Sequence, residues 1–316
     1  MSTRMSNLID LTDLTDLIKP YRTISIIGMS KNAGKTTALN HLIKGLTRKN
    51  QRLALTSIGR DGEDTDIVTK TDKPRICAPM GSIIITCEKL LDLCDITKEI
   101  LAVTDIHTPL GRIVVVRAKS SGFVQLGGPS VTTQMSGLLQ DLKKLGAGTV
   151  DKIIIDGAIS RKSLASPSLA DAAILCAGPG QRRNINTAIS EVRHAVLMLT
   201  LPVDAAEFSH MEKIYLPGAI SDARLKELVL SRPSLKNVIV VAADASKILA
   251  SAATYEKLQI RGGILAVQKA INLVALTVNP VSAYGFSFDA AEFLVKMQEA
   301  VSVPVFDLFK TDSGGN

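Results

Sequence analysis

Gly28-Met-Ser-Lys-Asn-Ala-Gly-Lys-Thr-Thr37 is a glycine-bearing segment that joins two apolar stretches near the start of the chain. Residues 23–27 before it read Thr-Ile-Ser-Ile-Ile, which is typical of a buried strand. Residues 36–49 after it carry leucine and isoleucine at helical spacing. A strand, a glycine turn and a helix in direct succession predict a phosphate-binding loop. The next apolar stretch, 52–58, predicts a second, parallel strand and thus a βαβ unit.

The residue types of this segment suit the phosphates of a nucleotide. Backbone amides at the N-terminus of a helix attract an anion, and Lys35 adds positive charge for the β- and γ-phosphates. The hydroxyl of Thr36 is a suitable Mg²⁺ ligand. The alternative is a chance Gly-Lys-Thr-Thr at a helix start. The residues expected to contact the nucleotide are Gly28, Lys31, Asn32, Ala33, Gly34, Lys35, Thr36 and Thr37.

Acidic residues follow two further predicted strands. Asp156 ends the apolar run Ile-Ile-Ile-Asp, and a carboxylate there would lie beside the loop and bind Mg²⁺ directly or through water. The polar segment 59–66 also carries four acids, Asp61, Glu63, Asp64 and Asp66. We expect Asp61 or Asp64 to complete the metal site or to orient an attacking water, because hydrolysis needs a positioned nucleophile. A plain solvated acidic loop is the alternative.

Polar and aromatic residues follow the late apolar stretch 272–278. Asn279 comes directly after it, and its side chain offers a donor and an acceptor that suit the edge of adenine. An ordinary Asn-Pro turn explains it nearly as well. An aromatic platform for a base or a partner is expected among Tyr284, Phe286 and Phe288. The cations that follow core strands are expected to bind an anion or a partner, or to be solvated: Arg161, Lys162, Arg182 and Arg183.

The composition excludes several classes of protein. The chain has 316 residues, and its longest apolar runs are far shorter than the roughly 20 residues of a membrane span. Its N-terminus does not lead into an apolar signal segment, so a cytoplasmic protein is expected. The first 200 residues carry a net charge of +8 but only two of the 11 aromatic residues, which disfavours a single-stranded nucleic-acid binder. The four cysteines show no metal-binding spacing and are expected to be buried.

Alternating strand and helix patterns predict an α/β fold with a doubly wound, mostly parallel sheet of the P-loop NTPase kind. We expect an N-terminal helix in residues 1–20 and a nucleotide-binding domain in residues 21–200. Residues 201–316 are expected to form a C-terminal α/β region, including a helix at 245–260. This region either stands as a second domain or returns its last strands to the first sheet.

The loop resembles that of the dethiobiotin synthetases, since Gly28 stands seven residues before Lys35, one more than in the usual phosphate-loop pattern. This class of P-loop proteins includes the MinD-type ATPases and the signal-recognition GTPases. Asp156-Gly157-Ala158 is similar to their Glu-Gly-Ala. The resemblance implies that Lys31 adds charge at the phosphates, as a second catalytic lysine, or reaches across a homodimer; a solvated loop lysine is the alternative.

Three longer phrases resemble the ATPase subunit of the reactivating factor encoded with lysine 5,6-aminomutase and ornithine aminomutase. They are the segment 28–37, Leu-Thr-Ser-Ile-Gly-Arg-Asp-Gly-Glu at 55–63 with Lys-Pro-Arg-Ile at 73–76, and Ile-Asp-Gly-Ala-Ile-Ser-Arg-Lys-Ser at 155–163. The resemblance implies hydrolysis of ATP with Mg²⁺, coupled to restoring an adenosylcobalamin-dependent aminomutase. It implies two partners, the aminomutase and a second ATPase subunit that resembles MutS proteins.

Two other functions stay open from the sequence. One is an ATP-dependent ligase or kinase of the dethiobiotin synthetase type, which would place a substrate-binding lysine directly after the second strand. Gly59-Arg60 holds that place here and weakens this alternative. The other is a non-catalytic nucleotide switch that reports the state of the nucleotide to a partner.

Overall fold

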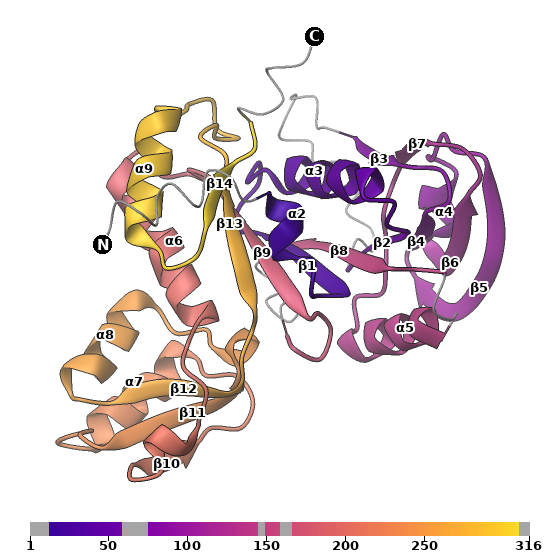
Figure 1. Cartoon of the computed structure of the whole chain (residues 1–316). Coiled ribbons are helices and arrows are strands. Elements are labelled where there is room, and N and C mark those ends of the chain that lie inside the picture. Colours follow the sequence, from indigo (N-terminus) through magenta and orange to yellow (C-terminus); the bar gives the residue numbers. More distant parts are fainter. Residues whose placement is uncertain (1–12, 59–74, 145–148, 159–165, 310–316) are drawn as a thin grey trace.

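A nine-stranded sheet forms the centre of the molecule (Figure 1). The computed structural model describes residues 13–58, 75–144, 149–158 and 166–309. The strands of this sheet, in spatial order, are β14 (Val305–Asp307), β13 (Leu273–Val278), β9 (Ala172–Ala177), β1 (Thr23–Gly28), β8 (Lys152–Ala158), β2 (Leu53–Ser57), β4 (Ile83–Cys87), β6 (Gly111–Ala118) and β5 (Lys98–Thr108). All neighbours from β14 to β4 are parallel, whereas β6 and β5 are antiparallel. The expected α/β class with a mostly parallel sheet is confirmed.

Helices cover both faces of this sheet, as a doubly wound fold requires. The short α2 (Leu14–Leu17) and α3 (Lys35–Arg48) pack on one face, where Leu39 and Leu42 join Ile26 and Ile154 in one cluster. The helices α5 (Thr132–Lys144), α6 (Ile185–Leu199) and α9 (Ala290–Ala300) pack on the other face. Figure 1 shows α3 and α5 on opposite sides of the central strands. Residues one apart on a strand point to opposite faces, so each apolar strand supplies both cores.

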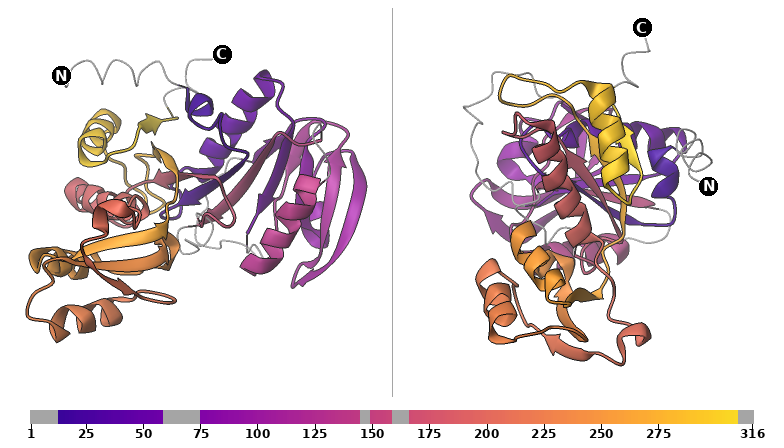
Figure 2. Two further views of the ribbon diagram at one scale, coloured as in Figure 1. Left: turned by 60° about the horizontal axis from the view of Figure 1, so that its bottom comes forward. Right: turned by 90° about the vertical axis from the view of Figure 1, so that its left-hand side faces the viewer.

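A smaller parallel sheet is inserted between α6 and β13. Its strands are β10 (Glu212–Tyr215), β11 (Val238–Asp244) and β12 (Ile264–Lys269), with α7 (Asp222–Ser231) and α8 (Ala252–Ile260) between them. Leu225 and Leu258 of these helices share one apolar core with Val192 of α6. Figure 2 shows this orange segment at one end of the molecule and the antiparallel strands at the other. The described part of residues 201–316 therefore forms a separate sheet and also returns β13 and β14 to the large one.

Several local predictions are wrong in detail. The expected helix 245–260 is broken into a short 3-10 helix, η3 (Ala245–Lys247), and α8, because Ser251 caps α8 by accepting a hydrogen bond from the Thr254 amide. The strands β5 and β12 were not expected. β5 lies at the edge of the sheet and exposes much of its length, so it lacks a continuous apolar run. The strands β1 and β2 are parallel, as expected, but β8 lies between them.

Four further short elements lie in the described residues. They are β3 (Ile76–Ala78), which pairs with β7 (Gly122–Val124), the helix α4 (Glu88–Leu91) and the 3-10 helix η2 (Ala206–Phe208). In the part of the chain that the structure covers, no helix has the length and apolar character needed to cross a membrane.

The N-terminal helix is anchored by a buried lysine. Of the expected helix in residues 1–20, the structure describes the part from residue 13, where Asp13 caps α2 by accepting from the Thr15 amide at 3.1 Å. The ammonium of Lys152 on β8 donates to the backbone carbonyls of Ile18, Lys19 and Tyr21. Burial lowers the pKa of Lys152, and only 7% of the residue is exposed. The chain leaving α2 is thereby tied to the central sheet.

Candidate functional site

The carboxyl ends of the central parallel strands bring three chain segments together. β1 lies between β8 and β9, with Gly28 opposite Ala158 on one side and Cys176 on the other. The loop after β1 leads to α3 on one face of the sheet, whereas the chain after β9 leads to α6 on the other face. Such a reversal of winding opens a crevice at this edge, where α/β proteins bind ligands. The segment singled out in the sequence, residues 28–37, lies at this point.

Lys35 lies back across the end of β1. A Cβ atom built on Gly28 would stand 2.5 Å from Cδ and 2.6 Å from Cγ of Lys35, which shows that the lysine stem occupies this space. Lys35 is the first residue of α3 and is only partly exposed. Any larger residue at position 28 would displace the lysine, so the glycine is explained by this close approach.

The first turn of α3 is open to an anion. Gly34 is its N-cap with φ 87°, a left-handed conformation that suits glycine, and no described side chain caps the helix. The first amides of a helix lack intrahelical acceptors and carry the positive end of its dipole. Thr36 and Thr37 in this turn are only partly exposed. The amides, the Lys35 ammonium and the Thr36 hydroxyl thus belong to one short turn.

Asn279 holds the loop from the neighbouring strand end. It follows β13, is 2% exposed, and donates from its side-chain amide to the Asn32 carbonyl at 2.6 Å. Its Oδ1 accepts from the Val281 amide at 3.0 Å, and the Asn32 side chain donates to the Val281 carbonyl at 3.3 Å. These bonds fix a loop in which Asn32 has a positive φ of 58°. The described contacts of Asn279 therefore shape the loop; reading of adenine by this residue stays a prediction.

Gly178 supports the same loop from β9. A Cβ atom at Gly178 would stand 3.1 Å from the Asn279 carbonyl oxygen and 3.6 Å from Cα of Ala33. Ala33 itself is buried, with 2% exposed. The segment 28–34 is thus packed between the ends of β9 and β13, and its backbone has little freedom to collapse onto the first turn of α3.

Thr36 and Asp156 carry the hydroxyl and the carboxylate that the sequence predicts as magnesium ligands. Asp156 is near the end of β8, opposite Ile26 of β1 and Ser57 of β2. Burial raises the pKa of the Cys176 thiol to about 12, while the charge of Lys35 lowers it and that of Asp156 raises it. Lys35 lies over Gly28, which is two residues beyond Ile26 on β1, so Lys35 and Asp156 belong to the same end of the sheet. Oxygen donors from Thr36 and Asp156 fit Mg²⁺, which usually takes only one or two protein ligands besides phosphate and water.

The described residues contain no larger cluster of metal-ligating side chains. Within these ranges, no group of three or more His, Cys, Asp and Glu side chains could hold a metal ion.

Three of the four cysteines are buried, as expected, but Cys77 on β3 is exposed.

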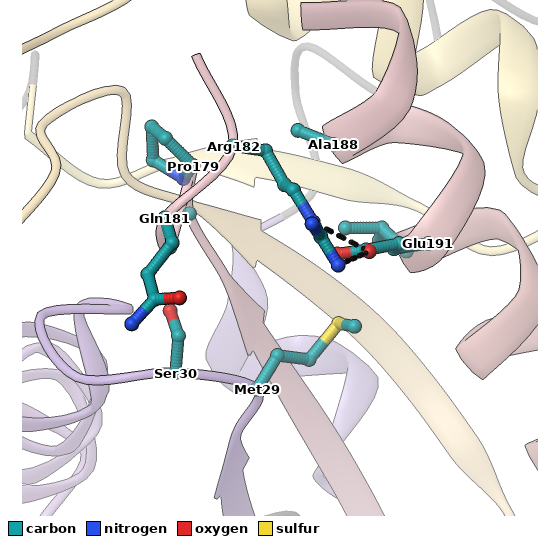
Figure 3. Close-up of a pocket in the computed structure, with 10 residues that line it drawn as sticks. Met29, Ser30, Pro179, Gln181, Arg182, Ala188 and Glu191 are labelled. Atoms are coloured by element: carbon teal, nitrogen blue, oxygen red, sulfur yellow. Dashed lines mark hydrogen bonds and ion pairs between the residues drawn. The ribbon is translucent and has the colours of Figure 1, made fainter. Parts of the chain in front are cut away.

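A small pocket opens beside the loop on the α6 side (Figure 3). Its volume is about 190 Å³, and it is lined by Met29 and Ser30, by residues 178–182 and by α6. Arg182 is paired with Glu191 of α6 at 2.6 Å across this pocket, and Figure 3 shows the two side chains facing each other. Arg182, which we expected to bind an anion or partner, or to be solvated, is thus engaged by a carboxylate of this chain.

The aromatic residues that follow Asn279 contact other side chains of this chain. The Tyr284 hydroxyl accepts from Gln181 at 3.1 Å, and the Arg183 guanidinium stands 5.1 Å from the centre of the Phe286 ring. Phe288 packs against Phe293 of α9 at 5.3 Å between ring centres. A different aromatic residue, Phe309, approaches Gly34 in the loop, and no motif in the sequence marks it. Its only signal in the sequence is its place just after the last strand.

Several predicted residues lie outside the described ranges. They are Asp61, Glu63, Asp64, Asp66, Arg161 and Lys162. Lys31 lies in the loop and is exposed. The structure thus brings together Gly28, Asn32, Ala33, Gly34, Lys35, Thr36, Thr37, Asp156 and Asn279 at one edge of the sheet. No protein-family model matches the chain, and no curated protein matches it in sequence.

Proposed function

We propose that the chain is a Mg²⁺-dependent ATPase of the P-loop kind, which binds its nucleotide at residues 28–37. The observation that carries the proposal is the position of Lys35: its stem crosses Gly28 at the uncapped start of α3, at the carboxyl end of a central parallel strand. A positive side chain and the positive end of a helix then face the same anion. A triphosphate is the common ligand that needs this concentration of positive charge.

The proposed roles follow from the chemistry of each group. The amides of the first turn of α3 and Lys35 stabilise charge on the β- and γ-phosphates. Thr36 and Asp156 hold Mg²⁺, which neutralises the phosphate oxygens when bound. Water attacks the γ-phosphorus, the bond to the leaving β-phosphate oxygen breaks, and ADP, phosphate and a proton are released. Orientation of that water by Asp61 or Asp64, and an additional contribution of Lys31, remain predictions from the sequence.

Calorimetric titration with Mg²⁺ and a non-hydrolysable ATP analogue tests the site. The wild-type chain should bind, and Lys35→Ala should weaken binding by tenfold or more, on the order of the energy of one charge-assisted contact. Lys44→Ala on the same helix is the matched control, since Lys44 is exposed and belongs to the far part of α3. Equal affinity of Lys35→Ala and wild type would refute the site.

The proposed client is an adenosylcobalamin-dependent aminomutase, together with a MutS-like ATPase subunit. This part of the proposal is supported by the three sequence phrases that resemble the reactivating factor. A purified aminomutase, inactivated by a damaged cobalamin, should regain activity when this chain, the second subunit, Mg²⁺-ATP and fresh cofactor are added. Recovery without ATP, or with Lys35→Ala at the wild-type rate, would contradict the coupling.

A further inference from the structure

Phe309 is held at the same edge of the sheet as the loop. It follows β14, which is parallel to β13, so both strands end on the side where β1 ends. Leu308 beside it is 4% exposed and belongs to the core under α3, and the Phe309 amide donates to Oδ1 of Asp307 at 3.0 Å. The chain entering Phe309 is therefore anchored at the end of β14, while 37% of the residue stays exposed.

The ring of Phe309 contacts the start of α3. A Cβ atom on Gly34 would stand 3.1 Å from Cε2 and 3.3 Å from Cζ of Phe309, with Cβ of Asn279 next at 3.4 Å. The Cε2–Cζ edge of the ring is thus turned toward the N-cap of the helix. Phe309 thereby presents a partly exposed aromatic ring directly beside the proposed phosphate site.

A nucleotide bound by its phosphates must place its base outside the loop. The loop is flanked by β9 and β13 on one side, and the strand end beyond β13 is that of β14, which carries Phe309. Aromatic rings stack on bases, and each such contact contributes to affinity without requiring a particular base. Tyr284 and Phe286 contact Gln181 and Arg183, whereas the Phe309 ring approaches Gly34 at the start of α3. The Asn279 amide is bonded to the loop.

We propose that Phe309 stacks against the base of the bound nucleotide and is the main contact of the chain with that base. This inference rests on the proposed function, because it needs the phosphates at residues 28–37. It assigns base binding to stacking by Phe309 and leaves Asn279 the role of holding the loop.

The chain contains no tryptophan, so Phe309→Trp introduces a single fluorescent reporter at the site. Mg²⁺-ATP should quench or shift this fluorescence, whereas Mg²⁺-tripolyphosphate, which has phosphates but no base, should change it little while competing with ATP. Tyr284→Trp is the control, and its emission should respond much less to ATP. Phe309→Leu keeps an apolar side chain against Gly34 but lacks the ring; it should weaken ATP binding about tenfold and leave tripolyphosphate binding unchanged.

Three results would overturn the inference. If Phe309→Leu weakens ATP and tripolyphosphate equally, Phe309 only supports the loop. If Phe309→Leu weakens neither ligand, or if the emission of Phe309→Trp does not change when ATP binds, the base lies elsewhere. The proposed nucleotide site at residues 28–37 would not be affected by this result. If the wild-type chain binds neither ATP nor tripolyphosphate, the proposed function fails and the stacking fails with it.

Discussion

The side-chain amide of Asn279 donates to the backbone carbonyl of Asn32 at 2.6 Å, across the end of β9 in the central sheet. The bond joins the end of β13 to the loop between β1 and α3, and the asparagine is almost completely buried. A loop that binds phosphate through its backbone must be held open before the ligand arrives. The contact explains how a segment with two positive-φ residues, Asn32 and Gly34, keeps one conformation.

Asn279→Ala should weaken both the fold and the site. It removes a buried hydrogen bond and leaves the Asn32 carbonyl without this donor, at a cost of about 1–3 kcal/mol in unfolding free energy. Nucleotide affinity should fall about tenfold, as the loop loses its support. Denaturant unfolding and calorimetry measure the two effects. Asn272→Ala, which removes an exposed bond to Asp171 before β13, is the control and should leave nucleotide affinity unchanged; equal losses in both variants would contradict the role of Asn279.

Gly28→Ala should abolish nucleotide binding while the protein stays folded. The added Cβ would overlap the side-chain stem of Lys35. The stem would have to move away, and this would also move the Lys35 ammonium from its position. The matched control is Gly137→Ala in α5, where a Cβ meets nothing within 4 Å. That substitution should raise the unfolding free energy by about 0.5–1 kcal/mol, because alanine favours a helix over glycine. If Gly28→Ala binds nucleotide with the wild-type affinity, the position of Lys35 over Gly28 is not needed for binding.

The cysteines provide a chemical test of the fold. Cys77 is exposed, whereas the thiol of Cys176 is fully buried and its pKa is raised to about 12. The reactive thiolate of Cys176 is therefore scarce at pH 8–9. Iodoacetamide should modify the folded protein at Cys77 alone, and Cys77→Ser should resist labelling until denaturant is added. Mass spectrometry of the modified peptides reports this, and rapid native labelling at Cys176 would contradict the burial of β9.

Lys152 should contribute more to stability than a surface lysine. Lys152→Met leaves the carbonyls of Ile18, Lys19 and Tyr21 without their shared donor, so we expect a loss of about 3 kcal/mol in unfolding free energy. Lys119→Met, at an exposed position, should change it by less than about 0.5 kcal/mol. Urea unfolding of both variants measures the difference. Similar midpoints would show that the lysine does not anchor the chain after α2.

The sequence predicted the parts of this molecule that depend on local pattern. The apolar run before Gly28, the helix after it and the acid near the end of β8 were all recognisable, because strand and helix periodicities and turn residues are local. The break before α8 was missed because the capping of Ser251 competes with an otherwise continuous helical pattern. The edge strand β5 was missed because it pairs on one side only and stays largely exposed.

The sequence did not predict the contacts between segments that lie far apart in the chain. The insertion of β8 between β1 and β2 joins residues far apart in the chain, and no local pattern encodes it. Asn279 was singled out for its donor and acceptor, yet its described bonds go to the loop itself. Phe309 was not predicted as a site residue, because it comes close to Gly34 only through the pairing of β14 with β13.

The rate of phosphate release from Mg²⁺-ATP tests the central claim most directly. Purified chain should release phosphate only with Mg²⁺ present, Lys44→Ala should match the wild type, and Lys35→Ala should lose the activity by at least a hundredfold, since Lys35 stabilises charge in the transition state. An unchanged rate in folded Lys35→Ala, or the absence of turnover in the wild type with and without its proposed partners, would contradict the account.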